Sequence, residues 1–90
     1  MINIENVWEN IIKHEGQEFM QIRGQKFTYK LNDSKSALMP STTEQWLSKT
    51  VFEKALAFMP LTSTKEVQHL RGPSYLYAIL TDKRISGGAR

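Results

Sequence analysis

The sequence predicts an α+β domain with an N-terminal helix, a three-stranded antiparallel meander, and then two or three C-terminal helices. Three observations predict this class. Apolar residues recur at helical spacing near the N-terminus, alternate with polar residues in the following segment, and return to helical spacing in the second half of the chain. In folds of this class the helices cover one face of the antiparallel sheet.

The length and composition indicate one globular domain. Ninety residues are enough for a single core, and 40% hydrophobic with 23% charged residues is close to a globular average. We expect residues 1–82 to form this domain and residues 83–90, which contain two glycines and little to bury, to form a flexible C-terminal tail.

The compartment is predicted from what the sequence lacks. The chain has no cysteine, which excludes disulfides, thiol nucleophiles and thiolate metal sites. Residues 1–5 lack the basic and apolar regions of a signal peptide, and no run of about 18 apolar residues is present. We therefore expect a cytoplasmic protein without a membrane partner.

The first helix is predicted to begin at Ile4, because Asn3 is a residue type that caps helix N-termini. Apolar residues then follow at the spacing of one helical face. They are Ile4, Val7, Trp8, Ile11 and Ile12. Gly16 ends the helix. The charge is divided along the chain, with −3 over residues 1–18 and +6 over residues 19–90.

Three strands are predicted after this helix. The first two, residues 19–22 and 26–31, form a hairpin with its turn at Gly24. In the second strand, apolar and polar side chains alternate, so one face is apolar and the other basic. The third strand, residues 35–39, stops at Pro40 because proline cannot continue a paired ladder. The sequence leaves the strand order open.

Residues 41–49 have two alternatives, a helical turn that starts at Ser41 or an extended arm. A capping-box pattern at Thr50 and Glu53 predicts the start of the next helix. Pro60 closes that helix.

The most apolar helix is predicted from Pro73 to about Thr81, after a short helix that starts at Ser63. Gly72 can adopt the positive φ that ends the short helix, and Pro73 suits the first position of the next one. The side chains from Tyr75 to Leu80 place apolar groups on almost every side of the predicted helix. This helix therefore has to be covered on most sides, and we expect it to organise the core.

Several short motifs are spread over most of the chain. They are Phe27-x-Tyr29, Ser48-Lys49-x-x-Phe52-Glu53-Lys54-Ala55-Leu56, Pro60-Leu61 and Gly72-Pro73-Ser74-Tyr75-x-Tyr77-Ala78-Ile79-Leu80. With these motifs, the chain resembles a small bacterial family of uncharacterised single-domain proteins. The resemblance implies a stand-alone bacterial domain, and it implies no activity, cofactor or site.

Catalytic and metal-binding chemistry has little support. Glu66-x-x-His69 is half of a di-metal motif, but a second copy is missing, so we predict a solvent-exposed pair. Ser74 lies at a predicted helix start without the Gly-x-Ser-x-Gly elbow of hydrolases. Tyr75 and Tyr77 are predicted core residues, with a ligand pocket as the alternative. We therefore predict a non-enzyme that needs no cofactor or metal.

Basic residues form the strongest candidate for a binding surface. The predicted nucleic-acid-binding residues are Arg23, Lys26, Lys30, Lys35 and Lys49. If Lys26, Thr28 and Lys30 share the outer face of one strand, they form a stripe able to contact phosphates. The alternative is a solvated sheet face with edge lysines that prevent aggregation. The aromatic residues that would stack on bases point to the opposite face.

The sequence thus predicts a small non-enzymatic binding module, with nucleic acid as an electrostatically bound partner. The alternative prediction is a protein-interaction or regulatory subunit, including a homodimer. Salt separates the two, because phosphate contacts weaken steeply as salt rises and an apolar protein interface hardly responds. The identity of the partner and the oligomeric state stay open.

Overall fold

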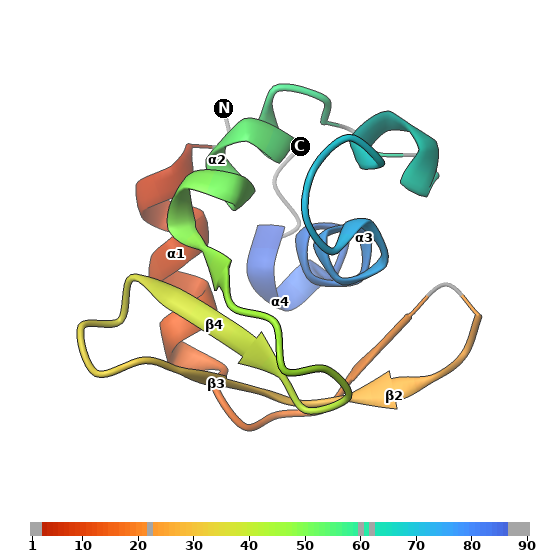
Figure 1. Cartoon of the computed structure of the whole chain (residues 1–90). Helices are drawn as coiled ribbons and strands as arrows, with labels where there is room; N and C mark the ends of the chain where they lie inside the picture. Colours follow the sequence, from red (N-terminus) through yellow and green to blue (C-terminus); the bar gives the residue numbers. More distant parts are fainter. Residues whose placement is uncertain (1–2, 22, 60, 62, 87–90) are drawn as a thin grey trace.

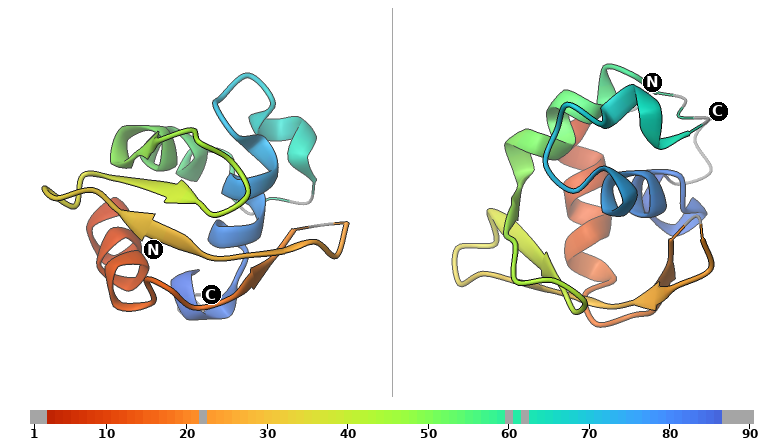
Figure 2. Two further views of the ribbon diagram at one scale, coloured as in Figure 1. Left: turned by 60° about the horizontal axis from the view of Figure 1, so that its bottom comes forward. Right: turned by 45° about the vertical axis from the view of Figure 1, so that its right-hand side comes forward.

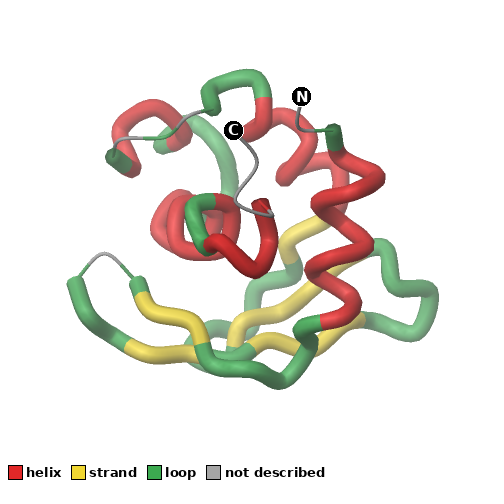
Figure 3. The backbone as a smooth tube through the Cα atoms, turned by 180° about the vertical axis from the view of Figure 1, so that it is seen from behind, coloured by secondary structure: helices red, strands yellow, loops and turns green. Residues whose placement is uncertain are grey.

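The structure is a computed structural model that describes residues 3–21, 23–59, 61 and 63–86. In chain order, an N-terminal helix is followed by five short strands in two small antiparallel sheets and then by the C-terminal helices (Figure 1). The helices lie together on one side of the strands (Figure 3). The predicted α+β class is confirmed. None of the helices in the described ranges is both long enough and apolar enough to cross a membrane.

The N-terminal helix α1 (Ile4–Lys13) begins as the sequence predicts. The Asn3 side chain accepts a hydrogen bond from the backbone N–H of Asn6 at 2.9 Å, which satisfies one donor of the first turn. The predicted apolar face is the buried one. Its buried residues are Val7, Trp8 and Ile11. The Trp8 indole also donates to the Lys35 carbonyl at 2.7 Å, which joins α1 to the strand region.

The strands form two separate antiparallel sheets (Figure 2). They are β1 (Phe19–Met20), β2 (Lys26–Phe27), β3 (Tyr29–Leu31), β4 (Ala37–Pro40) and β5 (Leu47–Ser48). β1 pairs with β2 in one sheet, and β3, β4 and β5 pair in that order in the other. Thr28 separates β2 from β3 within one extended segment, and it exchanges hydrogen bonds with Ser41.

Several strand predictions need correction. The second predicted strand, residues 26–31, is divided at Thr28 between the two sheets. The third continues through Pro40, which pairs with Tyr29 as the last residue of β4. The third strand begins at Ala37 rather than at residue 35, because Lys35 has a φ of 57° and belongs to the turn before β4. Residues 41–49 contain the unpredicted strand β5, so the extended alternative is the right one for this segment. Ile22, the predicted last residue of the first strand, lies outside the described residues.

The next helix, α2 (Lys49–Leu56), starts earlier than predicted. Ser48 is its N-cap in place of Thr50, and the Ser48 hydroxyl accepts from the backbone N–H of Val51 at 3.3 Å. β5 ends directly at this cap. Pro60, which was expected to close the helix, lies outside the described residues.

The predicted starts of the two following helices are confirmed. Ser63 and Glu66 form a capping box at the 3₁₀-helix η1 (Thr64–Val67). Gly72 has a φ of +64° and precedes α3 (Pro73–Leu80), in which proline occupies the first turn. Most of α3 is buried, as its composition predicts. The buried residues are Leu76, Ala78, Ile79 and Leu80.

The predicted tail begins with a helix. Lys83–Ser86 form α4, and Ile85 is fully buried in the hydrophobic core. The Asn10 side chain donates to the Ile85 carbonyl at 2.8 Å, which fixes α4 against α1. The packed part of the chain therefore extends beyond residue 82. Residues 87–90 of the predicted tail lie outside the described residues.

Replacement of Ile85 by alanine tests whether α4 belongs to the core. We expect Ile85→Ala to lower the free energy of unfolding by about 2–4 kcal/mol, because it leaves a cavity in a packed interior. Urea unfolding followed by circular dichroism measures the loss. The exposed neighbour provides the control, since Lys83→Ala should change stability by less than about 0.5 kcal/mol. Equal effects of the two variants would contradict the packing of α4.

Replacement of Gly72 by alanine tests how closely the start of α3 approaches Leu47 of β5. A Cβ at Gly72 would lie 3.0 Å from Leu47 Cδ2, whereas a Cβ at Gly24, where φ is +87°, would meet nothing within 4 Å. Both alanine variants strain a left-handed backbone by about 1–2 kcal/mol. We expect Gly72→Ala to cost about 1–3 kcal/mol more than Gly24→Ala, because it also overpacks the core. Thermal and urea unfolding of both variants measure the difference, and similar losses would disprove the contact.

Candidate functional site

One face of the strands is left uncovered by the described helices. In the extended segment 26–31 the side chains of Phe27 and Tyr29 are buried, and those of Lys26 and Lys30 are exposed. Directly paired residues of antiparallel strands project to the same side. The pairs Lys26–Met20 and Lys30–Met39 therefore define an outer face, opposite to the helices. We call this surface, with Thr28, the outer face.

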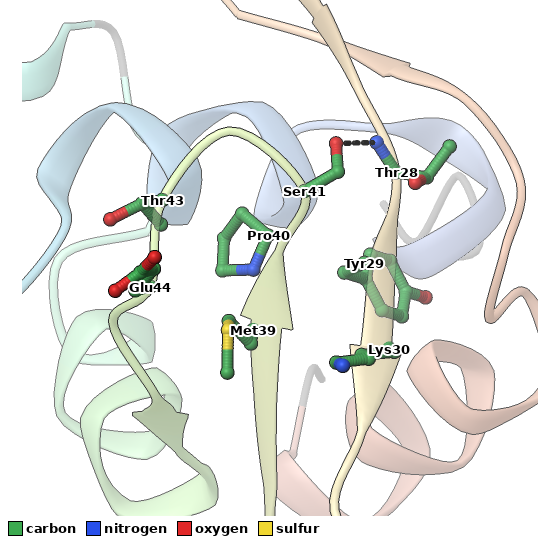
Figure 4. Close-up of a pocket in the computed structure, with 8 residues that line it drawn as sticks. All are labelled: Thr28, Tyr29, Lys30, Met39, Pro40, Ser41, Thr43 and Glu44. Atoms are coloured by element: carbon green, nitrogen blue, oxygen red, sulfur yellow. Dashed lines mark hydrogen bonds between the residues drawn. The ribbon is translucent and has the colours of Figure 1, made fainter.

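A groove of about 360 Å³ lies on this face. Strands β3 and β4 contribute one part of it, and the loop that follows β4 contributes the other (Figure 4). Its lining residues are Thr28, Tyr29, Lys30, Met39, Pro40, Ser41, Thr43 and Glu44. The groove is thus made of segments that only the pairing of β3 with β4 brings together.

The loop side of the groove is fixed by hydrogen bonds. The backbone N–H of Ser41 donates to the Thr28 carbonyl at 2.7 Å, and the Ser41 hydroxyl accepts from the Thr28 N–H at 3.0 Å. One residue later, the hydroxyls of Thr42 and Tyr75 lie 2.5 Å apart, which ties the loop to α3. The N–H of Thr43 donates to the Pro40 carbonyl at 3.2 Å. These bonds preform the groove before any ligand arrives.

Charges of both signs line the groove. Figure 4 shows Lys30 and Glu44 on opposite sides of Met39. Both charged side chains are exposed. Within the part of the chain that the structure describes, neither forms an ion pair or a side-chain hydrogen bond, and the hydroxyls of Thr28 and Thr43 also have no partner. The groove therefore presents an ammonium, a carboxylate and two hydroxyls that are free to bind.

The five predicted nucleic-acid-binding residues are placed along the strands and turns but do not converge. Arg23 is exposed in the turn between β1 and β2, and Lys35 is exposed in the turn between β3 and β4. Lys26 lies on the outer face, with its ammonium 3.8 Å from the Glu18 carboxylate. Only Lys30 belongs to the groove.

Lys49 lies elsewhere. It is the first residue of α2, and its ammonium is 3.2 Å from the Glu5 carboxylate of α1. This pair joins the two helices on their own side of the molecule. The predicted set of five basic residues is thereby reduced to the four in the strands and their turns.

Thr28 belongs to the predicted stripe, but the remaining groove residues were not predicted from the sequence as part of a site. The Ser41-x-x-Glu44 pattern predicts a helix start, and the structure instead uses Ser41 to bond Thr28 and leaves Glu44 at the groove. Thr43 and Met39 carry no sequence signal of a site. Their common position depends on strand pairing, which a linear pattern does not report.

The remaining candidates of the sequence have local structural contacts. Glu66 belongs to the capping box of η1, and the His69 ring packs 5.2 Å from that of Phe58. The Ser74 hydroxyl accepts from the Gln21 side chain at 3.2 Å. No group of three histidine, aspartate or glutamate side chains in the described ranges is placed to hold a metal ion. None of these residues lines the groove.

A second polar cluster surrounds Arg84. Its guanidinium donates to the Asp82 carboxylate at 2.9 Å, to the Gln17 side chain at 3.1 Å and to the Glu18 carbonyl at 2.8 Å. It also lies 4.1 Å from the centroid of the Phe19 ring. The side-chain hydrogen bond from Arg84 holds the pKa of Asp82 below its usual value, and the same bond raises the pKa of Arg84. The Arg84 guanidinium thus has hydrogen-bond partners within the fold, and its contacts anchor α4 to β1.

Comparison of the chain with protein-family models, with curated proteins and with solved structures gives no match. The groove and the outer face are therefore the features of this chain that indicate a function.

The Arg84 cluster predicts a pH dependence of stability. Because the pKa of Asp82 is lowered on folding, its carboxylate stabilises the fold above the unfolded pKa of about 3.9, and this contribution is lost as the pH falls through the folded value. We expect Asp82→Asn to cost on the order of 1 kcal/mol at neutral pH, since the pair is partly exposed.

The difference between wild type and Asp82→Asn should shrink below about pH 4. Urea unfolding at a series of pH values measures it, with the exposed Glu53→Gln as the matched control. A difference that stays constant down to about pH 2 would contradict the assigned role of Asp82.

Proposed function

We propose that the protein is a small non-enzymatic binding module that holds a protein partner on its outer face. One observation carries the proposal: this face contains a preformed groove in which Lys30, Glu44 and the hydroxyls of two threonines form no ion pair or side-chain hydrogen bond with the described residues. The helices and the core lie on the other side of the strands. These four polar groups of the groove are thus free to serve a ligand.

The distribution of charge favours a protein partner. On the outer face Lys26 is accompanied by Glu18, and in the groove Lys30 is accompanied by Glu44. Carboxylates repel the uniformly negative backbone of a nucleic acid, whereas a protein surface offers charges of both signs. Met20 adds apolar contact area, because 55% of this side chain is exposed. Methionine side chains adapt readily to the shape of a partner.

Nucleic acid is the second candidate, supported by the exposure of four basic residues along the strands and turns. These are Arg23, Lys26, Lys30 and Lys35. The 3.8 Å pair of Lys26 with Glu18 is a weak obstacle, since both side chains are about 60% exposed and such pairs contribute little. The lysine therefore stays available to a phosphate.

The proposal includes a cytoplasmic location, supported by the cysteine-free sequence. It also includes a second copy of the chain as one form of protein partner. A homodimer formed through the outer face would cover the same residues as a different protein would.

Site-specific photo-crosslinking tests the proposed face. A photoreactive amino acid replaces Met20 on the outer face in one variant and Glu53 on α2 in the other, and both are irradiated in cells of the source organism. We expect a discrete protein adduct from position 20, at least tenfold stronger than any adduct from position 53. Equal adducts from both positions, or none from position 20, would contradict a protein partner on this face.

A fluorescence-anisotropy titration tests the second candidate. Labelled duplex and single-stranded DNA are titrated with the protein at low and moderate salt, alongside the triple variant Arg23→Ala, Lys26→Ala, Lys30→Ala. Under the protein-partner proposal no appreciable binding is expected. Binding that weakens steeply with salt and disappears in the variant would instead establish the nucleic-acid function.

A further inference from the structure

We propose that the groove binds an extended peptide segment of the partner that carries one acidic and one basic side chain. The acidic side chain pairs with Lys30 and the basic side chain with Glu44. This inference rests on the proposed function, because it assigns the chemistry of the ligand to the same outer face.

Charge complementarity selects this ligand. Lys30 and Glu44 line one groove from opposite sides of Met39, and neither is paired within the described part of the chain. A purely anionic ligand would meet repulsion from Glu44, and a purely cationic ligand would meet it from Lys30. A segment with both charges in the matching order satisfies both residues and leaves no like charges facing each other.

The size and the polar lining favour extended backbone. A cavity of about 360 Å³ is at the small end of ligand sites, and a helix of about 10 Å diameter requires more room. An extended segment exposes its own N–H and C=O groups, for which the free hydroxyls of Thr28 and Thr43 are suitable partners. Met39, between the two charges, provides an apolar contact for the aliphatic part of the segment.

The spacing of the two charges in the segment follows from strand geometry. In extended backbone, side chains at positions i and i+2 point to the same side and are about 6.6 Å apart. An acidic and a basic residue separated by one residue would therefore both face the groove. Because the loop is already fixed by Ser41 and Thr42, the segment would not have to order it on binding.

The test uses four blocked pentapeptides with a central threonine and terminal glycines. Two of them place aspartate and lysine around the threonine, one in each order, and the other two carry two aspartates or two lysines. Each is titrated into ¹⁵N-labelled protein, and the backbone amide shifts are followed by NMR. We expect one mixed-charge order to bind several-fold more tightly than the three others, with shifts at Lys30, Met39 and Thr43.

A charge exchange within the groove provides the decisive variant. In the double variant Lys30→Glu, Glu44→Lys, the preference between the two mixed-charge orders should reverse, because the two binding charges have changed places. The matched control is Glu53→Lys, Lys54→Glu, which exchanges two exposed charges on α2 and should keep the wild-type preference. All four substituted residues are exposed, so both variants are expected to fold, and circular dichroism verifies this.

Three results would overturn the inference. They are the absence of groove shifts with every peptide at millimolar concentration, equally tight binding of a peptide with charges of one sign, and an unchanged preference in the charge-exchange variant. The crosslinking experiment at position 20 separates the two proposals. A protein adduct from position 20 together with failure of all peptides would disprove the groove specificity and leave the outer face as the partner's surface.

Discussion

The placement of the sheet against α1 depends on the burial of Tyr29. Its side chain is 2% exposed, its ring lies 5.4 Å from that of Phe19, and its hydroxyl donates to the Ile11 carbonyl at 2.5 Å. A buried hydroxyl without a partner is costly, so the tyrosine is buried only where α1 offers this carbonyl. The same burial raises the pKa of Tyr29. Because Tyr29 points inward, its neighbours Thr28 and Lys30 point outward, and the core thereby determines the outer face.

The edge of β3 that faces away from β4 is occupied by the segment that follows α1, which limits how a partner can approach. The backbone N–H of Gly16 donates to the Tyr29 carbonyl at 3.2 Å, and the Glu15 carboxylate accepts from the Leu31 N–H at 2.8 Å. Occupied edge groups cannot pair with a strand of another chain. A partner of this sheet region therefore meets the face of β3, where the groove lies, rather than its edge.

The polar groups around Arg84 and those in the groove differ in whether they have hydrogen-bond partners within the fold. The Arg84 guanidinium is bound by a carboxylate, a side-chain amide and a backbone carbonyl, and it contacts an aromatic ring. Such a network stabilises the position of α4. In the groove, Lys30 and Glu44 have no such partners among the described residues. Packing explains the first cluster and does not explain the second, and for this reason the groove carries the functional proposal.

The sequence by itself determined the α+β class and the starts of several helices, because periodicity and capping are local properties of the chain. Asn3, Ser63 and Gly72 have the predicted roles. Only the tertiary structure decided where α4 packs, because a four-residue helix is too short for an apolar period. It also decided the groove, since the pairing of β3 with β4 and the course of the following loop bring Lys30 and Glu44 together. Their meeting depends on the register of distant segments, which no local pattern in the sequence encodes.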